Sequence, residues 1–416
     1  MAVTPGGQKA RSHARSLDAV NFLLADVRGA LGPFLNVFLV TQQHWSQSLV
    51  GLVTTVSGLL GLAAQTPIGA AIDATRSKRG VVILALAVLA AGSVAIAVAP
   101  TFWPVFIANG LIGLVGDVFG PAVASLTLGL FARKQLARRM GRNAVWDHAG
   151  NVAIALAAGA VGYAFSQRAV FFLVPVFAVL AALAVLSIPA RDIDYERSRG
   201  SDGERPADCA QESSPGWGIL FKTRPLVVLG VCMMLFHFAN APLLPLVGQK
   251  LAGANPLLAT AMMSSCIVAA QLVMLPIALL TGIAAERFGS KPVFLVGFAI
   301  LPIRAVLYTF SDNSAWLISV QLLDGVGAGI FSVLMPLAVA DIMRGTGRYN
   351  LALGAVTTMV GIGASVSGLA AGVIVDKFGY DAAFFTLGGA ALLAFAVLAI
   401  AMPETAPDKA APPRSG

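Results

Sequence analysis

Charged residues are scarce in this chain, where Asp, Glu, Lys and Arg together make up 12% of the 416 residues. Soluble globular domains average about 25%. Hydrophobic residues make up 57% and gather in runs that are long enough to cross a lipid bilayer as helices. This balance excludes the soluble globular class and predicts an all-α, multi-pass membrane protein.

Cysteine and histidine are also rare. The three cysteines, Cys209, Cys232 and Cys266, have no CxxC spacing, and two of them lie inside hydrophobic runs. No disulfide framework, metal site or bound cofactor is therefore predicted. The sequence also contains no HExxH, P-loop or Ser/His/Asp pattern, so we do not expect an enzyme.

Basic residues exceed acidic ones and give a net charge of +8. The Lys and Arg residues lie almost entirely between the hydrophobic runs, which is typical of topology signals at a membrane surface and not of a nucleic-acid interface. If both termini are cytoplasmic, 23 of the 28 Lys and Arg residues fall on the cytoplasmic side. The positive-inside rule therefore predicts this orientation.

Twelve hydrophobic spans can be drawn, six on each side of one long hydrophilic segment. The segment is rich in charge, Ser, Pro and Gly, which is typical of a flexible linker. The predicted parts are an N-terminal cytoplasmic tail (1–16), a six-helix bundle (17–189), a cytoplasmic linker (190–224), a second six-helix bundle (225–402) and a C-terminal cytoplasmic tail (403–416). The spans cover about residues 17–40, 48–72, 81–99, 102–129, 143–166, 169–189, 225–249, 257–284, 292–310, 314–340, 350–375 and 381–402.

The two halves of the chain are weak copies of each other, at offsets of about 206–215 residues. Parallel repeats of this kind are typical of alternating-access transporters, in which the binding site lies between the halves at the bilayer midplane. The matching positions are Gly69 to Asp73 with Gly282 to Glu286, Asn109 and Gly110 with Asp324 and Gly325, Pro121 with Pro336, Gly141 and Arg142 with Gly347 and Arg348, and Phe171 and Phe172 with Phe384 and Phe385.

The loop after the second span and its later copy share a short pattern of glycine, acid and base. The later copy has Gly282, Glu286 and Arg287, while the earlier copy has Gly69 and Asp73 but lacks the adjacent base. With twelve spans around a central linker, the chain resembles the bacterial permeases of the major facilitator superfamily (MFS), loosely its drug/proton antiporter branch. The resemblance implies two pseudo-symmetric six-helix bundles and a cytoplasmic gate at these five residues.

In that fold, spans one, four, seven and ten line the central cavity, and these spans hold polar residues in this sequence. A charge at the middle of a span costs about 2.5–3.5 kcal/mol on insertion scales, so such residues are expected to face protein or water. The candidate substrate-binding and proton-binding residues are Asp26, Arg28, Asn109, Asp117, His237, Asn240, Gln321 and Asp324.

Proton coupling is predicted from the balance of charges inside the spans. Asp26, Arg28, Asp117, Arg304 and Asp324 sum to −1 if all are ionised. A surplus carboxylate in a site of low dielectric favours protonation. We therefore expect Asp26 or Asp117 to carry the proton, Arg28 to assist its release or bind a substrate anion, and His237 to be a second titrating group.

These features predict a secondary active transporter for a small organic solute, proton-coupled, acting in efflux and working as a monomer in the bacterial cytoplasmic membrane. One alternative is an uptake symporter for an organic anion, with Arg28 holding a carboxylate. Another is a divalent-metal exporter, with a site formed by Asp26, His237 and Asp324. No extramembrane domain or catalytic pattern favours a membrane enzyme or receptor.

Overall fold

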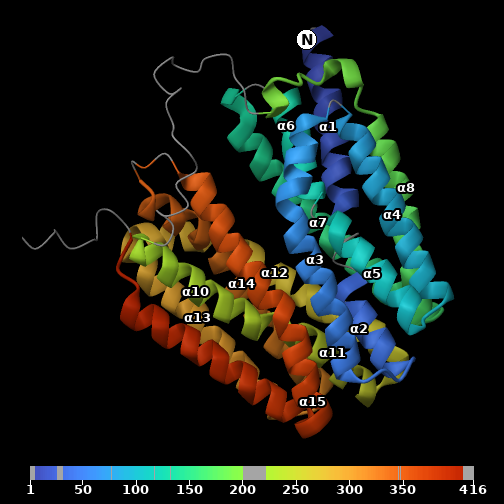
Figure 1. Ribbon diagram of the computed structural model, residues 1–416, viewed down its shortest axis with the longest axis vertical. Coiled ribbons are helices and arrows are strands. Elements are labelled where there is room, and N and C mark those ends of the chain that lie inside the picture. Colours follow the sequence, from blue (N-terminus) through green and yellow to red (C-terminus); the bar gives the residue numbers. More distant parts are fainter. Residues whose placement is uncertain are drawn as a thin grey trace, which may run out of the picture. The chain divides into compact units, whose positions relative to one another are not determined.

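The computed structural model describes residues 5–25, 31–75, 77–116, 118–131, 133–199, 222–344, 346 and 348–405. Every regular element among them is a helix (Figure 1). The α-helices are α1 (Pro5–Leu24), α2 (Leu31–Thr41), α3 (Gln47–Ala74), α4 (Lys78–Val98), α5 (Phe102–Gly116), α6 (Phe119–Leu130), α7 (Arg133–Ala164), α8 (Leu173–Leu186), α10 (Arg224–Asn240), α11 (Leu243–Ala254), α12 (Ala259–Phe288), α13 (Ser290–Leu307), α14 (Ser314–Ile342) and α15 (Tyr349–Ala401). Short 3-10 helices are η1 (Gln167–Phe172), η2 (Ala190–Asp192), η3 (Arg197–Arg199) and η5 (Pro256–Leu258).

Ten segments of the described chain are long and apolar enough to cross a membrane, which confirms an all-helical membrane protein. One of them is the whole of α15, 53 residues long, which is interrupted at Gly379. Gly379 has φ 84°, a conformation that glycine adopts at little cost, and it separates the two last predicted spans. The first predicted span, 17–40, is divided between α1 and α2, with residues 26–30 outside the described residues. The count of twelve membrane-spanning helices stays a prediction.

Proline divides the seventh predicted span. The helix α10 ends at Asn240, and α11 begins at Leu243 after Pro242. Proline has no N–H to continue the helical hydrogen bonds, and it clashes with the preceding turn. The helix is therefore interrupted directly after the polar residues His237 and Asn240.

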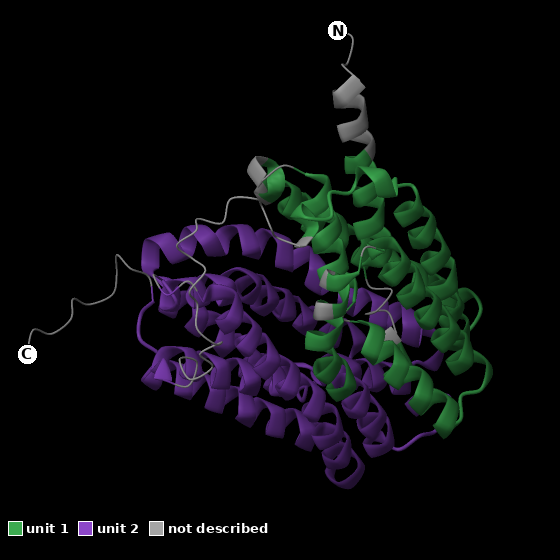
Figure 2. Cartoon of the chain, turned by 45° about the horizontal axis from the view of Figure 1, so that its top comes forward, with its two compact units in different colours: residues 1–38, 59–214 green, residues 39–58, 215–416 purple. Residues whose placement is uncertain are grey.

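The described helices group into two compact units (Figure 2). Unit 1 comprises residues 1–38 and 59–214, and unit 2 comprises residues 39–58 and 215–416, so α3 contributes to both. In unit 1, α4 packs against α5 and α8, while α1 packs against α7 and α8. In unit 2, α10 packs along α15, α12 packs along α14, and α13 contacts α14 and α15.

Buried polar contacts join the helices within unit 1. Asp18 on α1 is buried and accepts a hydrogen bond of 2.7 Å from the guanidinium of Arg139 on α7. Arg142, one turn further along α7, forms a second ion pair with Asp18. One carboxylate therefore balances two guanidinium groups where α1 meets α7.

The first ten residues after Pro189 are folded onto unit 1, in contrast to the flexible segment expected there. The backbone N–H of Asp194 donates to the carbonyl of Gly129 at 3.0 Å, and Ser125 donates to the carbonyl of Ser198 at 2.9 Å. The side chain of Arg197 donates to Asp194 and lowers the pKa of that carboxyl. The start of the predicted linker is thus anchored on α6.

A carboxylate near the C-terminal end of the described chain caps α13. Glu404 accepts hydrogen bonds from the backbone N–H groups of Ser290 at 2.9 Å and Lys291 at 3.1 Å. Gly289 has φ 93°, and a Cβ added there would lie 2.6 Å from an oxygen of Glu404. The acid that binds this helix end is therefore Glu404, while Glu286 and Arg287 of the predicted gate are exposed.

We expect Glu404→Ala to lower the free energy of unfolding by about 1 kcal/mol, because the helix N-terminus loses its capping acceptor. Thermal unfolding of the purified protein in detergent would measure this. Glu404→Gln keeps an acceptor oxygen and serves as the control, with a smaller loss expected. Equal stability of Glu404→Ala and the wild-type protein would contradict the capping role.

Candidate functional site

A buried cluster of polar side chains lies inside unit 2. Its centre is Arg304 on α13, whose guanidinium forms an ion pair with Asp324 on α14. The same guanidinium donates a hydrogen bond of 2.5 Å to the side-chain oxygen of Asn240 on α10. Arg304 therefore links three helices of unit 2.

Two further side chains extend this cluster. Gln321, one turn before Asp324 on α14, donates to the other oxygen of Asp324 at 3.0 Å. The hydroxyl of Tyr308, at the C-terminal end of α13, donates to the side-chain oxygen of Gln321. Asp324 thus accepts from Arg304 and Gln321, and the carboxylate is held from two sides.

The two members of the ion pair differ in exposure. The side chain of Arg304 is 2% exposed and that of Asp324 is 22% exposed. Arginine stays protonated in proteins, whereas a carboxylate can be neutralised by a proton. The enclosed member therefore carries a permanent charge, and the more accessible member carries a charge that protonation can remove.

A cavity of about 280 Å³ lies beside the ion pair. His237, Asn240, Arg304, Asp324 and Ser332 give it a polar side, and Phe236 and Phe331 belong to its apolar wall. The rings of Phe236 and Phe331 pack with their centroids 4.1 Å apart. Nδ1 of His237 lies 3.0 Å from the carbonyl oxygen of Met233, which orients the imidazole. A polar solute in this cavity would meet a positive charge from Arg304 and a negative charge from Asp324 on one side, and aromatic rings on the other.

The structure brings four of the predicted site residues together: His237, Asn240 and Asp324 line the cavity, and Gln321 contacts Asp324. Asn109 lies buried on α5 in unit 1. Asp26, Arg28 and Asp117 lie outside the described residues. Of the predicted gate, Gly69 and Asp73 are on α3, with the side chain of Asp73 outside the described residues, and Gly282, Glu286 and Arg287 are on α12. The gate stays a prediction.

The sequence analysis counted Arg304 in the charge balance of the spans, but it named neither Arg304 nor Tyr308 as a site residue. Arg304 lies on α13 and Tyr308 directly follows that helix, and both belong to the ninth predicted span, which was not expected to face the cavity. An arginine near the middle of an apolar span is itself the signal that could have identified the site, because such a charge needs a partner inside the protein.

Comparisons with known proteins agree on one family. A family model described as Major Facilitator Superfamily matches residues 17–280 and 261–416. An uncharacterized MFS-type transporter of Mycobacterium tuberculosis is 47% identical over 392 residues, which cover 94% of this chain and 93% of the relative. The tetracenomycin C resistance and export protein of Streptomyces glaucescens is 31% identical over 144 residues, which cover 33% of this chain and 26% of that protein.

Solved structures show the same fold at low sequence identity. A crystal structure of the nucleoside transporter NupG aligns with a TM-score of 0.75 at 15% identity, covering 93% of this chain and 98% of that chain. At this level of identity the likeness concerns the arrangement of helices and not the solute.

Proposed function

This chain belongs to the major facilitator superfamily, and we propose that it is a secondary active transporter that exports a small organic solute in exchange for protons. The observation that carries this proposal is the Arg304–Asp324 ion pair beside a cavity in unit 2. Ionisable residues inside a membrane protein are costly to bury and typically mark substrate or proton paths.

In this proposal Asp324 takes part in proton coupling. Its carboxylate lines the cavity and is more exposed than Arg304, so a proton arriving through the cavity reaches Asp324 first. Protonation would leave the Arg304 guanidinium without a counter-charge, which destabilises the present packing and favours a rearranged state. Asp26 and Asp117, the carriers predicted from the sequence, stay part of the proposal beside Asp324.

The direction of transport and the membrane topology of the chain are also part of the proposal. Export is supported by the name of the tetracenomycin C resistance and export protein, which matches a third of the chain. The distribution of Lys and Arg supports twelve helices with both termini in the cytoplasm of a bacterium. We place the transporter in the cytoplasmic membrane as a monomer.

We expect Asp324→Asn to reduce pH-gradient-driven flux to the level of protein-free vesicles, while counterflow of the solute without a gradient persists. The amide keeps an acceptor for Arg304 but cannot take up and release the proton. The measurement uses the purified full chain in proteoliposomes with a solute selected by thermal-shift screening at two pH values. Asp341→Asn, near the end of the same helix in a pair with Arg344, is the control and should leave the flux unchanged.

Two outcomes would contradict the proposal. Undiminished gradient-driven flux in Asp324→Asn, and also in Asp26→Asn and Asp117→Asn, would remove the proposed proton carriers. Ohmic conductance without saturation or counterflow would indicate a channel instead of a carrier.

A further inference from the structure

The last turn of α10 places two polar side chains next to each other at the cavity of unit 2. His237 and Asn240 are three residues apart, a spacing that puts them on one face of the helix, and both line the cavity. An imidazole has two tautomers and an amide can be turned over, so either group can be a hydrogen-bond donor or an acceptor toward a solute. Their neighbours in unit 2 decide between these alternatives.

The tautomer of His237 is fixed by its own helix. Nδ1 lies 3.0 Å from the carbonyl oxygen of Met233, one turn earlier. A carbonyl oxygen only accepts, so Nδ1 must carry the hydrogen and donate it. In the neutral ring Nε2 then keeps its lone pair, and none of the described residues hydrogen-bonds to it. His237 therefore offers an acceptor at the cavity.

The orientation of the Asn240 amide is fixed by Arg304. A guanidinium has N–H donors and no acceptor, so the 2.5 Å contact requires the amide oxygen of Asn240 to face Arg304. The NH₂ group is the other arm of the same amide, and it donates to no group in the described part of the chain. Asn240 therefore offers donors beside the acceptor of His237.

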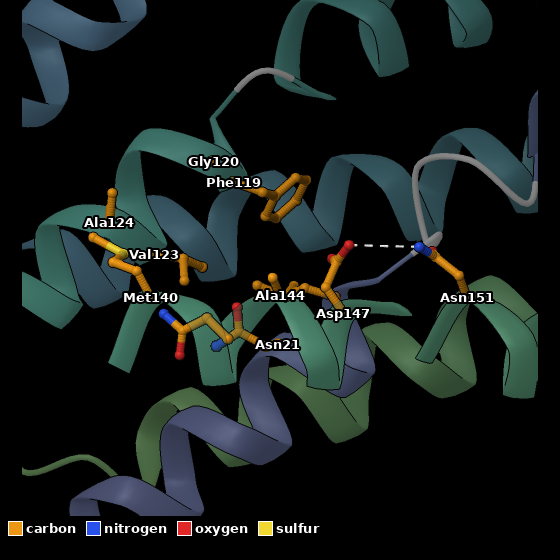
Figure 3. Close-up of a pocket in the computed structure, with 11 residues that line it drawn as sticks. Asn21, Phe119, Gly120, Val123, Ala124, Met140, Ala144, Asp147 and Asn151 are labelled. Atoms are coloured by element: carbon orange, nitrogen blue, oxygen red, sulfur yellow. Dashed lines mark hydrogen bonds between the residues drawn. The ribbon is translucent and has the colours of Figure 1, made fainter. Parts of the chain in front are cut away.

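The amides at the cavity of unit 1 differ in this respect. That cavity, of about 460 Å³, lies among α1, α6 and α7 (Figure 3). Two of its asparagines use their amides inside the protein: Asn151 donates to the carboxylate of Asp147 at 3.5 Å, and Asn21 donates to the carbonyl of Leu17 at 2.7 Å. The amide of Asn240 is thus the better placed to donate to a solute.

The space beside His237 suits a flat ring. The cavity of unit 2 has a volume of about 280 Å³, and Phe236 and Phe331 belong to its wall. Their ring centroids lie 5.4 Å and 6.5 Å from that of His237, so the aromatic wall adjoins the polar edge. Gly327 leaves room in the lining, because a Cβ added there would meet only Phe236, at 4.0 Å. A planar solute can therefore contact aromatic side chains while its edge meets polar ones.

We propose that the cavity of unit 2 binds an aromatic lactam, whose ring N–H donates to Nε2 of His237 and whose carbonyl accepts from the amide of Asn240. A lactam presents a donor and an acceptor next to each other, which complements the neighbouring acceptor and donor of the protein. A hydroxyl group could meet both protein groups only through a single oxygen atom. The inference names the solute class of the proposed transporter and rests on that function for the movement of the solute, while binding itself is independent of proton coupling.

The test compares three flat bicyclic probes on the purified full chain in nanodiscs at about pH 8, where an ordinary histidine is neutral. Carbostyril is a lactam, coumarin has a ring oxygen in place of the N–H, and β-naphthol carries a hydroxyl group. We expect carbostyril to bind about tenfold more tightly than coumarin, because coumarin leaves the acceptor of His237 without a donor. Binding of β-naphthol should also be weaker than that of carbostyril.

Two substitutions separate the two contacts. His237→Phe keeps a ring but removes the acceptor, so carbostyril binding should weaken about tenfold while coumarin binding does not weaken. Asn240→Asp keeps an oxygen for Arg304 but replaces the donor with an acceptor, so both carbonyl probes should bind about tenfold or more weakly. Exposed residues provide the controls: Asn350→Asp, and His44→Asn, which suits the φ of 56° at that position. Neither control should change an affinity.

Equal affinities for carbostyril and coumarin in the wild-type protein, tightest binding of β-naphthol, or a preference for carbostyril that survives His237→Phe would each overturn the lactam site. The ratio of the carbostyril and coumarin affinities does not depend on how much of a variant is folded, and thermal unfolding of each variant measures that fraction separately. Carbostyril binding that needs His237, without any pH-gradient-driven flux of carbostyril, would count against the transport proposal and leave the site standing. Gradient-driven flux of another solute that needs Asp324, without carbostyril binding, would overturn the lactam site alone.

Discussion

Replacing Asp324 with leucine should destabilise unit 2 by about 3–5 kcal/mol, the cost of leaving one member of a buried ion pair without its partner. Arg304 is 2% exposed and cannot lose its proton, so its charge would remain enclosed with Asn240 as its neutral partner. The free energy of unfolding in mixed micelles, followed by tryptophan fluorescence, would measure the loss.

Replacing Arg304 instead of Asp324 should cost less stability. In Arg304→Met the remaining carboxylate is 22% exposed and can be neutralised by protonation. The double variant Arg304→Met with Asp324→Leu removes both charges and should recover most of the stability, because a buried pair is often no better than well-packed apolar groups. Additive losses in the double variant would show that the two residues do not act as a pair.

A second large effect is expected where α15 crosses the first part of α3, within unit 2. A Cβ added to Gly372 would lie 2.3 Å from the carbonyl oxygen of Gln47, and one added to Gly51 would lie 2.4 Å from that of Gly368. Backbone atoms cannot yield as a flexible side chain can. We therefore expect Gly372→Ala to cost about 3 kcal/mol, at the upper end of overpacking effects.

Gly354→Ala is the matched control on the same helix, because a Cβ added there meets nothing within 4 Å. Alanine is a better helix former than glycine by about 1 kcal/mol, so this variant should gain stability. The thermal midpoints of the two variants should therefore move in opposite directions. A similar shift for both would show that the close approach at Gly372 does not limit the packing.

Hydrogen bonds also join α15 to the first part of α3. The carboxylate of Asp376 accepts from the backbone N–H groups of Gln47 at 2.9 Å and Ser48 at 2.8 Å, and so caps α3. The side chain of Gln47 donates to the hydroxyl of Tyr380 at 2.9 Å. Residues 39–58 consequently group with the second half of the chain, more than 300 residues away.

Local patterns in the sequence were sufficient to predict where the membrane helices lie. Apolar runs predicted the membrane segments. Pro242 is also a local cause of the break after Asn240, because proline acts on its own turn. His237 and Asn240 were predicted site residues three positions apart, a spacing that places them on one helix face, and both line the cavity. Each of these features depends on neighbours within one or two turns, so the sequence is enough to explain it.

The sequence by itself determined an all-helical membrane protein of the major facilitator superfamily, with polar residues inside its apolar spans. Only the tertiary structure decided that Arg304, from a helix not expected at the cavity, pairs with Asp324, and that Asn21, Asp147 and Asn151 line one cavity. The helical period places a side chain on a face of its own helix, but the neighbour that this face meets depends on packing between distant segments.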